Sequence, residues 1–381
     1  MTAGQERPAG RSRGHGWAAH LRAGGTTPWS AWSEEAEPPA GAGALPGAEQ
    51  LELLRRLNAT GPVPAEVAAR VLTTTAPGRG RRGLPLLGDG PSPAYGAAPV
   101  DPSDLTADEL LREATLLLAQ DLVAGDSDPE PRYRWRRRLR ARYRLVGDRW
   151  LTGPMRDELL RRGRPQGGPG MTVYVVGAPL DELLTHVWTA RCFGQGAIAF
   201  DRWLARARRS DQLGPRGDLR QIAGWWAQRI GRQRVEIVLD PAELPALLGV
   251  RGRLPGPPRL AADAVEVARR VGPVLGLLVD PDERARLLRR ALLPRLRRTA
   301  APGAAGPALA VPDRHLDWVT EQAVALRDGL LADGYAFHGD PDILLPRART
   351  RGAAAAEGPD TDGALDLTLR LLLEGPRRGT S

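Results

Sequence analysis

Arginine is the residue whose chemistry is most prominent in this sequence, and its densest run spans residues 132–144. Guanidinium groups pair bidentately with phosphate and sulfate, and interleaved aromatic rings can stack on bases. The run therefore predicts a surface for a polyanion such as nucleic acid or an anionic polysaccharide. The alternative is a solvated, basic segment leading into a strand, and the formal net charge of +9 over 381 residues is modest for a nucleic-acid-binding protein. The predicted polyanion-binding residues are Arg134, Arg136, Arg137, Arg138 and Arg140.

All 54 basic residues counted as Lys or Arg are arginines, because the sequence contains no lysine. This excludes a Schiff-base lysine, a lysine general base and the lysine of a G-x-x-x-x-G-K-[ST] phosphate loop. Any anion must be bound by guanidinium groups or by backbone N–H groups.

Histidine and cysteine offer little metal or thiol chemistry. The five histidines are widely separated and none belongs to a metal-binding motif, so we predict no metal site. Cys192 is the single cysteine, which excludes an intrachain disulfide and indicates a reducing compartment. The first residues lack the pattern of a secretory leader, and the apolar runs are far shorter than the roughly 18 residues that span a bilayer. We therefore expect a cytoplasmic protein without a membrane partner.

Strand and helix patterns alternate from about residue 142 onward. Runs of apolar residues predict strands at 142–147, 171–176 and 235–239 and a short final strand within 334–346. Parallel neighbours need crossover connections, so the alternation predicts an α/β fold with a mostly parallel sheet flanked by helices. Helices are expected at 155–162, 180–190, 200–208, 218–230, 241–248, 259–271, 282–297 and 313–333.

Composition divides the chain into four parts. Residues 1–48 are predicted to be a largely flexible segment with a tryptophan-containing clasp, in which Thr27 caps a helix that begins at Pro28. Residues 49–104 are expected to form a helical extension and a Gly/Pro-rich linker. The α/β domain is assigned to 105–346, and 347–381 to a flexible tail with one isolated helical segment at 364–373.

One stretch after the second strand resembles a known family. Strand 173–176 is followed by Gly177-x-Pro179, five residues, Thr185, a Gly-rich bend and Phe200-x-x-Trp203. This order resembles the second half of bacterial, actinobacterial-type sulfotransferase domains, where the strand leads into Arg-x-Pro and a later Ser. The helix with Trp225 and Trp226 and the motif Gly-Tyr-x-x-x-Gly-Asp at 334–340 are also similar in order and spacing. The resemblance covers residues 140–346 and implies a sulfotransferase-like three-layer fold.

The resemblance also implies a donor, 3′-phosphoadenosine-5′-phosphosulfate, if the protein is an active enzyme. In the family, that Arg and Ser bind the 3′-phosphate, whereas here Gly177 replaces the Arg and Thr185 the Ser. Thr185 and Arg191 would then lie nearest the donor phosphate, and His186 or His338 would be the base for an acceptor hydroxyl. The nearest counterpart of the family's phosphate loop is Gly25-Thr26-Thr27, which lacks the lysine and a preceding strand. These departures imply a degenerate sulfotransferase-like protein that binds a phosphorylated nucleotide or another anion.

Two alternatives from other classes stay open. One is a non-catalytic module that binds a polyanion through residues 132–144. The other is a protein whose tryptophans at 17, 29, 32, 225 and 226 mediate assembly with another chain. The acceptor and the oligomeric state do not follow from the sequence.

Overall fold

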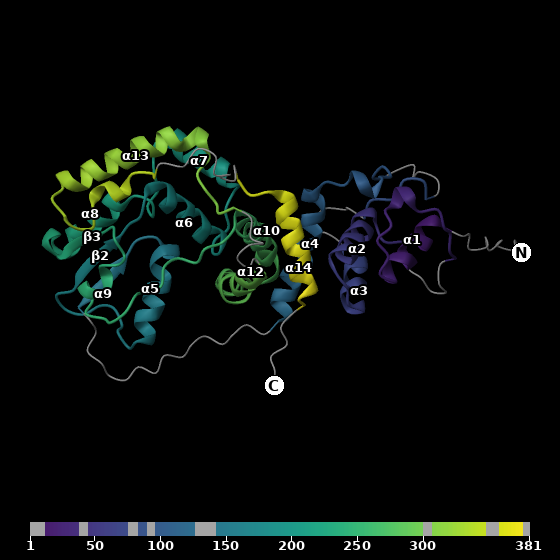
Figure 1. The fold of residues 1–381 in the computed structure, drawn as a ribbon, viewed down its shortest axis with the longest axis horizontal. Helices are drawn as coiled ribbons and strands as arrows, with labels where there is room; N and C mark the ends of the chain where they lie inside the picture. Colours follow the sequence, from purple (N-terminus) through teal and green to yellow (C-terminus); the bar gives the residue numbers. More distant parts are fainter. Residues whose placement is uncertain are drawn as a thin grey trace, which may run out of the picture. The chain divides into compact units, whose positions relative to one another are not determined.

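The structure is a computed structural model that describes residues 12–37, 45–74, 83–89, 96–125, 142–299, 307–347 and 358–375. The chain divides into two compact units (Figure 1). The helical unit comprises residues 1–127, 266–301 and 360–381, and the sheet unit comprises residues 128–265 and 302–359. The division falls inside helix α10 (Ala262–Leu278).

The sheet unit contains a four-stranded parallel sheet in the order β1-β2-β3-β4. This confirms the predicted α/β class with a mostly parallel sheet. The register places Tyr174 opposite Glu236 and Val238 opposite His338. The strands are β1 (Tyr143–Val146), β2 (Thr172–Val176), β3 (Val235–Val238) and β4 (Ala336–His338).

Helices cover both faces of this sheet. Side chains of α5 (Arg149–Arg161) and the short α9 (Leu244–Leu247), including Met155 and Leu244, pack on the face that carries Leu145. The neighbouring Arg144 points to the opposite face, because successive strand residues alternate, and its guanidinium lies 5.0 Å from the Trp226 ring of α8 (Leu219–Ile230). Figure 1 accordingly shows α5 and α9 on one side of β2 and β3, and α8 on the other.

The connection from β2 to β3 is built from three helices. Helix α6 (Leu180–Cys192) follows β2, α7 (Phe200–Ser210) comes next, and α8 leads into β3. Asp211 ends α7 in the left-handed conformation, with a φ of 49°. The 20-residue helix α13 (Asp313–Ala332) packs against all three. No helix within the described ranges has the length and apolar composition of a bilayer span.

The helical unit is assembled from segments far apart in the chain. Helix α14 (Thr361–Leu373) packs against α4 (Ala107–Ala124), α2 (Ala48–Thr60) and α12 (Leu293–Thr299), and its leucines such as Leu369 are buried. The prediction of an isolated helical segment in a flexible tail is therefore wrong for these residues. Helix α4, which we assigned to the α/β domain, also belongs to this unit. Its remaining helices are α1 (Arg13–Arg22), α3 (Ala65–Thr73) and α11 (Pro281–Leu287), the last continuing through a π-helical turn (Leu288–Leu292) into α12.

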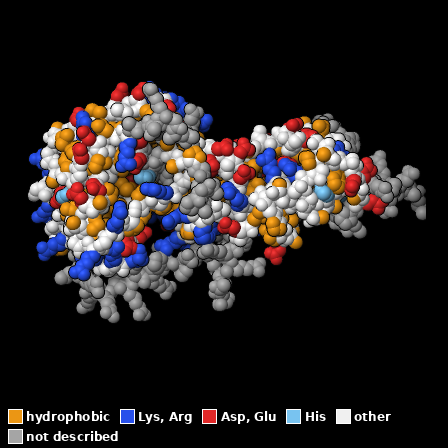
Figure 2. Space-filling model, in the orientation of Figure 1, with side chains coloured by type: hydrophobic (Ala, Val, Ile, Leu, Met, Phe, Trp, Pro, Cys, Tyr) orange, Lys and Arg blue, Asp and Glu red, His pale blue; other side chains and the backbone are white. Residues whose placement is uncertain are grey.

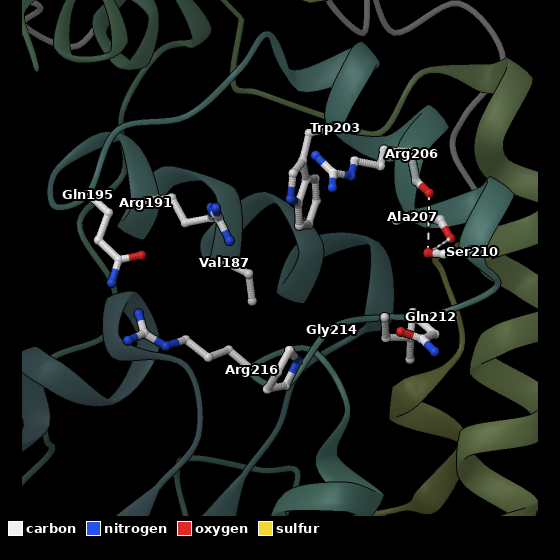
Figure 3. A pocket seen from close by; sticks show the side chains of 12 residues that line it. Val187, Arg191, Gln195, Trp203, Arg206, Ala207, Ser210, Gln212, Gly214 and Arg216 are labelled. Atoms are coloured by element: carbon white, nitrogen blue, oxygen red, sulfur yellow. Dashed lines mark hydrogen bonds between the residues drawn. The ribbon is translucent and has the colours of Figure 1, made fainter. Parts of the chain in front are cut away.

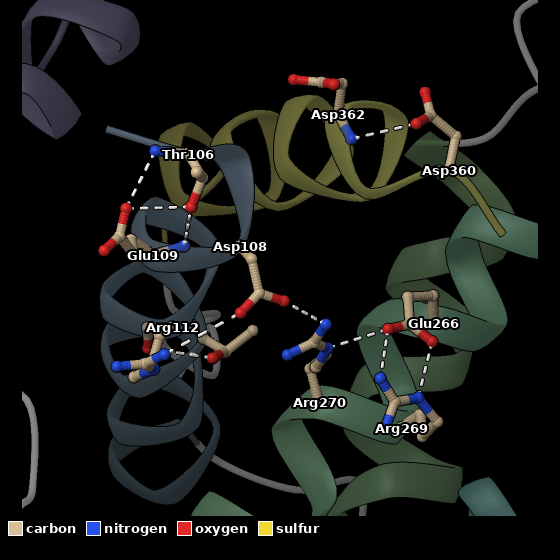
Figure 4. A network of polar contacts seen from close by, with 10 residues as sticks. Thr106, Asp108, Glu109, Arg112, Glu266, Arg269, Arg270, Asp360 and Asp362 are labelled. Atoms are coloured by element: carbon tan, nitrogen blue, oxygen red, sulfur yellow. Dashed lines mark hydrogen bonds and ion pairs between the residues drawn. The ribbon is translucent and has the colours of Figure 1, made fainter. Parts of the chain in front are cut away.

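A polar network joins α4 to the part of α10 in the same unit (Figure 4). Arg270 pairs with Asp108 of α4 and also with Glu266 of its own helix. Burial opposes ionisation of Glu266, yet hydrogen bonds and charge from Arg269 and Arg270 outweigh it and hold the Glu266 pKa below its ordinary value. The network thus keeps a buried carboxylate charged by surrounding it with guanidinium groups.

Two tryptophans near the N-terminus pack against each other inside the helical unit, and the turn after Pro28 differs from the predicted helix. Trp17 of α1 and Trp29 are both buried, with ring centroids 5.2 Å apart. Only a single 3-10 turn, η1 (Trp29–Ala31), forms after Pro28, and Thr27 does not cap it. Instead, the backbone carbonyl of Thr27 accepts a hydrogen bond from the indole of Trp17 at 2.9 Å.

Candidate functional site

The sheet unit contains a pocket of about 310 Å³ within the connection from β2 to β3 (Figure 3). It is lined by the second half of α6, by one face of α7 and by the loop that precedes α8. The lining residues are Val187, Arg191, Gln195, Trp203, Arg206, Ala207, Ser210, Gln212, Leu213, Gly214, Pro215 and Arg216.

The loop before α8 lies at the carboxyl edge of the sheet. Helix α8 ends just before β3 begins, so its first residues are at the opposite end of the strands. Leu219, the first residue of α8, lies against Gly177, which directly follows β2. Ligands of parallel α/β sheets bind outside the carboxyl ends of the strands, and the loop of the pocket meets that condition.

Three arginines give the pocket a positive charge without an acidic counterpart. Arg191 comes from α6, Arg206 from α7 and Arg216 from the loop, and none of the lining residues is acidic. Among the described residues, no carboxylate forms an ion pair with these three guanidinium groups. Figure 3 shows Arg191 pointing into the pocket above Val187, and Arg216 directed toward the amide of Gln195. Because a concave, low-dielectric wall focuses the field of such charges, this arrangement favours an anionic ligand.

Trp203 supplies a fixed aromatic wall. Its ring stacks on Phe200 with a centroid distance of 6.1 Å and an interplanar angle of 16°. Phe200 in turn packs against Trp188 at 5.0 Å, and both of these side chains are fully buried. The indole N–H of Trp188 donates to the carbonyl of Ile198 at 2.9 Å. This packing holds Trp203 on the pocket face of α7.

Asp148 is a buried carboxylate that interacts electrostatically with Arg216. It follows β1, caps α5 and accepts the N–H of Trp150 at 2.6 Å. Burial raises the Asp148 pKa, while its backbone hydrogen bonds and the charge of Arg216 act in the opposite direction. Its second oxygen, Oδ1, is buried without a hydrogen-bond partner in the described part of the chain. Asp148 itself does not line the pocket.

Of the residues that the resemblance associates with the donor phosphate, Arg191 lines the pocket and Thr185 does not. The hydroxyl of Thr185 donates to the carbonyl of Glu182 within α6 at 2.7 Å. At Gly177, where the family has arginine, an added Cβ would lie 2.6 Å from Leu219 and 2.8 Å from Leu239. A side chain at this position would therefore meet Leu219 and Leu239.

The two histidines predicted as bases have different surroundings, and neither lines the pocket. His186 precedes the pocket residue Val187, and burial lowers its pKa from 6.5 to about 4. Its Nδ1 is buried and has no hydrogen-bond partner among the described residues. His338 of β4 lies between two carboxylates, with Nε2 at 2.6 Å from Glu236 and Nδ1 at 3.6 Å from Glu243. His186 is therefore neutral at pH 7 but only weakly basic.

The segment Gly25-Thr26-Thr27 is a connector in the helical unit and follows α1 rather than a strand. The carbonyl of Gly25 accepts from Asn58 at 2.8 Å, and the Thr27 hydroxyl lies 3.0 Å from His20 Nε2. A phosphate loop needs a strand before it and a helix after it, so the interpretation of these residues as a phosphate loop is wrong.

The polyanion-binding residues proposed from the arginine run, Arg134, Arg136, Arg137, Arg138 and Arg140, lie outside the described residues. On the face drawn in Figure 2, basic and acidic side chains are intermixed rather than gathered into one large basic patch. Within the ranges that the structure describes, no group of three His, Cys, Asp or Glu side chains is arranged to hold a metal ion.

Neither Arg206 nor Arg216 was predicted from the sequence to bind a ligand, and Trp203 had no predicted role. Positions 203, 206, 207 and 210 are spaced as one helical face, and all four line the pocket. That spacing was the signal available in the sequence. Arg216 lies in an irregular loop, where no periodic pattern marks which side chains converge. Comparison of the chain with protein-family models, curated proteins and solved structures finds no match.

Proposed function

We propose that this pocket binds the phosphate groups of a small phosphorylated nucleotide, in a sulfotransferase-like protein whose donor site is degenerate. Three arginines that line one pocket without an acidic lining residue are the observation that carries the proposal. Guanidinium groups bind phosphate in a bidentate manner and cannot lose their charge in the physiological pH range.

The rest of the pocket suits the organic part of such a ligand. Its volume of about 310 Å³ lies at the lower end of the range for small-molecule sites. Trp203 offers an aromatic face for a base, and Gln195 and Gln212 add amide groups that can both donate and accept hydrogen bonds. We therefore favour a mononucleotide over a larger cofactor.

Binding is better supported than sulfuryl transfer from 3′-phosphoadenosine-5′-phosphosulfate. A side chain at Gly177 would meet Leu219 and Leu239, and the Thr185 hydroxyl is bonded within its own helix. His186, with its pKa of about 4, is a weak base for an acceptor hydroxyl. The proposal is therefore a nucleotide-binding protein, and catalytic activity is not part of it.

Isothermal titration with adenosine 3′,5′-bisphosphate tests the proposal. Arg191→Gln, Arg206→Gln and Arg216→Gln should each weaken binding by about 10- to 100-fold, because each removes a charge-assisted contact. Arg209→Gln is the matched control, since Arg209 is an exposed arginine of the same helix α7 that does not line the pocket. Absence of binding at millimolar ligand, or equal losses in the control and the pocket variants, would refute the proposal.

A second titration separates recognition of the nucleotide from recognition of phosphate alone. Trp203→Leu should weaken the binding of adenosine bisphosphate several-fold, because stacking is lost, and should leave the binding of inorganic pyrophosphate nearly unchanged. If the affinities for both ligands fall equally, Trp203 supports the pocket without contacting a base, and the ligand is a simpler anion.

A further inference from the structure

Helix α8 carries two adjacent tryptophans, and their rings lie between two arginines. Trp225 and Trp226 are 4.8 Å apart with an interplanar angle of 85°. The Arg229 guanidinium carbon lies 3.7 Å from the centre of the Trp225 ring, and that of Arg144 lies 5.0 Å from the centre of the Trp226 ring. Trp225 is 46% exposed, which is unusual for a side chain of this size. We call these four residues the tryptophan surface.

The charge on the tryptophan surface is not neutralised by neighbouring carboxylates. Among the described residues, neither Arg229 nor Arg144 forms an ion pair. Arg220, on the same helix, differs from them, because it forms a bidentate ion pair with Asp333 at 2.7 and 2.8 Å. The guanidinium N–H groups of Arg229 and Arg144 can therefore donate hydrogen bonds to an external anion.

From this arrangement we infer that the tryptophan surface binds single-stranded nucleic acid, by stacking of bases on the indole rings and pairing of phosphates with Arg144 and Arg229. Trp225 is exposed and Trp226 is half-buried, and cations without a carboxylate partner lie beside both rings. Single strands bind such a surface, because every base has a stacking face and every nucleotide carries a negative phosphate. An apolar protein partner would leave the two guanidinium groups buried without counter-ions, which is costly. The inference does not depend on the nucleotide pocket.

The angle between the two indole rings limits the conformation of a bound single strand of nucleic acid. The two rings are nearly perpendicular, so bases on Trp225 and Trp226 cannot belong to one continuous stack. The strand must bend between the two contacts, which a single strand does far more easily than a duplex. The tryptophan surface therefore favours single strands over duplexes and tolerates different sequences.

Fluorescence anisotropy of a labelled twelve-nucleotide oligothymidylate measures this binding. We expect Trp225→Ala to raise the dissociation constant by about 5- to 150-fold, since one stacked base contributes about 1–3 kcal/mol. Arg144→Gln and Arg229→Gln together should reduce the slope of log K against log salt by about 1.4, at about 0.7 for each neutralised phosphate. Arg298→Gln is the control, because Arg298 is an exposed arginine of α12 in the helical unit.

Several outcomes would overturn the inference. The inference is wrong if the protein does not bind oligothymidylate at low salt. It is also wrong if all variants bind it as the parent does, with an unchanged slope of log K against log salt. A doubled mass in light scattering that Trp225→Ala abolishes, without nucleic-acid binding, would assign the tryptophan surface to a second copy of the chain instead. Arg206→Gln, which should impair only the nucleotide pocket, must leave oligothymidylate binding unchanged, so failure of one proposal is distinguishable from failure of the other.

Discussion

The arginines of the described residues fall into two groups, according to whether a carboxylate lies beside the guanidinium. Arg220, Arg269 and Arg270 form ion pairs with carboxylates of the chain. Arg191 and Arg206, in contrast, are directed into a pocket without an acidic residue. In a chain without lysine, the residue type alone does not separate structural cations from ligand-binding cations, and only the neighbours in space do so.

A single residue, His186, should make the free energy of unfolding depend on pH. Its pKa is about 4 in the folded protein and 6.5 in the unfolded chain, so between these values only the unfolded state binds the proton. Stability should therefore fall as the pH decreases from about 6.5 to about 4, by about 3 kcal/mol in total, and then level off. A proton NMR titration of the imidazole should give the low midpoint directly.

His186→Leu should remove this contribution to the pH dependence, because the apolar side chain has no proton to bind. Urea unfolding at pH 7 and pH 4.5 measures the difference between the variant and the parent protein. A variant that loses stability on acidification as steeply as the parent would show that another group causes the loss.

At the scale of elements, the strands were predictable and the pocket was not. The run Val173-Tyr174-Val175-Val176 is short, β-branched and apolar, and it forms β2 within the predicted bounds. Helix α14 was misjudged because its leucines are spread around the helix, which we read as an unpartnered segment. In the structure its buried residues include Leu365, Leu367 and Leu371, since several helices surround it. Partners contributed by distant parts of the chain leave no trace in local periodicity.

Leu369 tests how much α14 contributes. It is 1% exposed, so Leu369→Ala should destabilise the protein by about 2–5 kcal/mol through lost burial and the cavity left behind. Chemical denaturation followed by circular dichroism provides the measurement. Leu331→Ala serves as the control, because that leucine is 48% exposed and should change stability by less than about 0.5 kcal/mol. Equal effects of the two substitutions would contradict the packing of α14.

At the scale of the whole molecule, the two units are each made from separated stretches of chain. The sequence pointed to contiguous parts at 1–48, 49–104, 105–346 and 347–381, because composition reports boundaries only along the chain. Which stretch packs on which depends on complementary faces, such as those of α4 and α14, and these become visible only in three dimensions.

The two compact units should respond separately to a ligand and to a core substitution in thermal unfolding. In differential scanning calorimetry, adenosine 3′,5′-bisphosphate should raise the transition of the sheet unit, because a ligand stabilises the state that binds it. Leu369→Ala should lower the other transition, that of the helical unit. One transition that shifts as a whole under both perturbations would mean that the units unfold together.

The late position of α14 in the chain has a consequence for biosynthesis. Helices α2 and α4 are synthesised before β1, and α14 is synthesised only after the last strand, β4. Until then, the faces of α2 and α4 that α14 covers have no native partner. The nascent chain is therefore expected to expose leucine-rich helices during most of its translation, and such transiently exposed apolar surface is prone to aggregation.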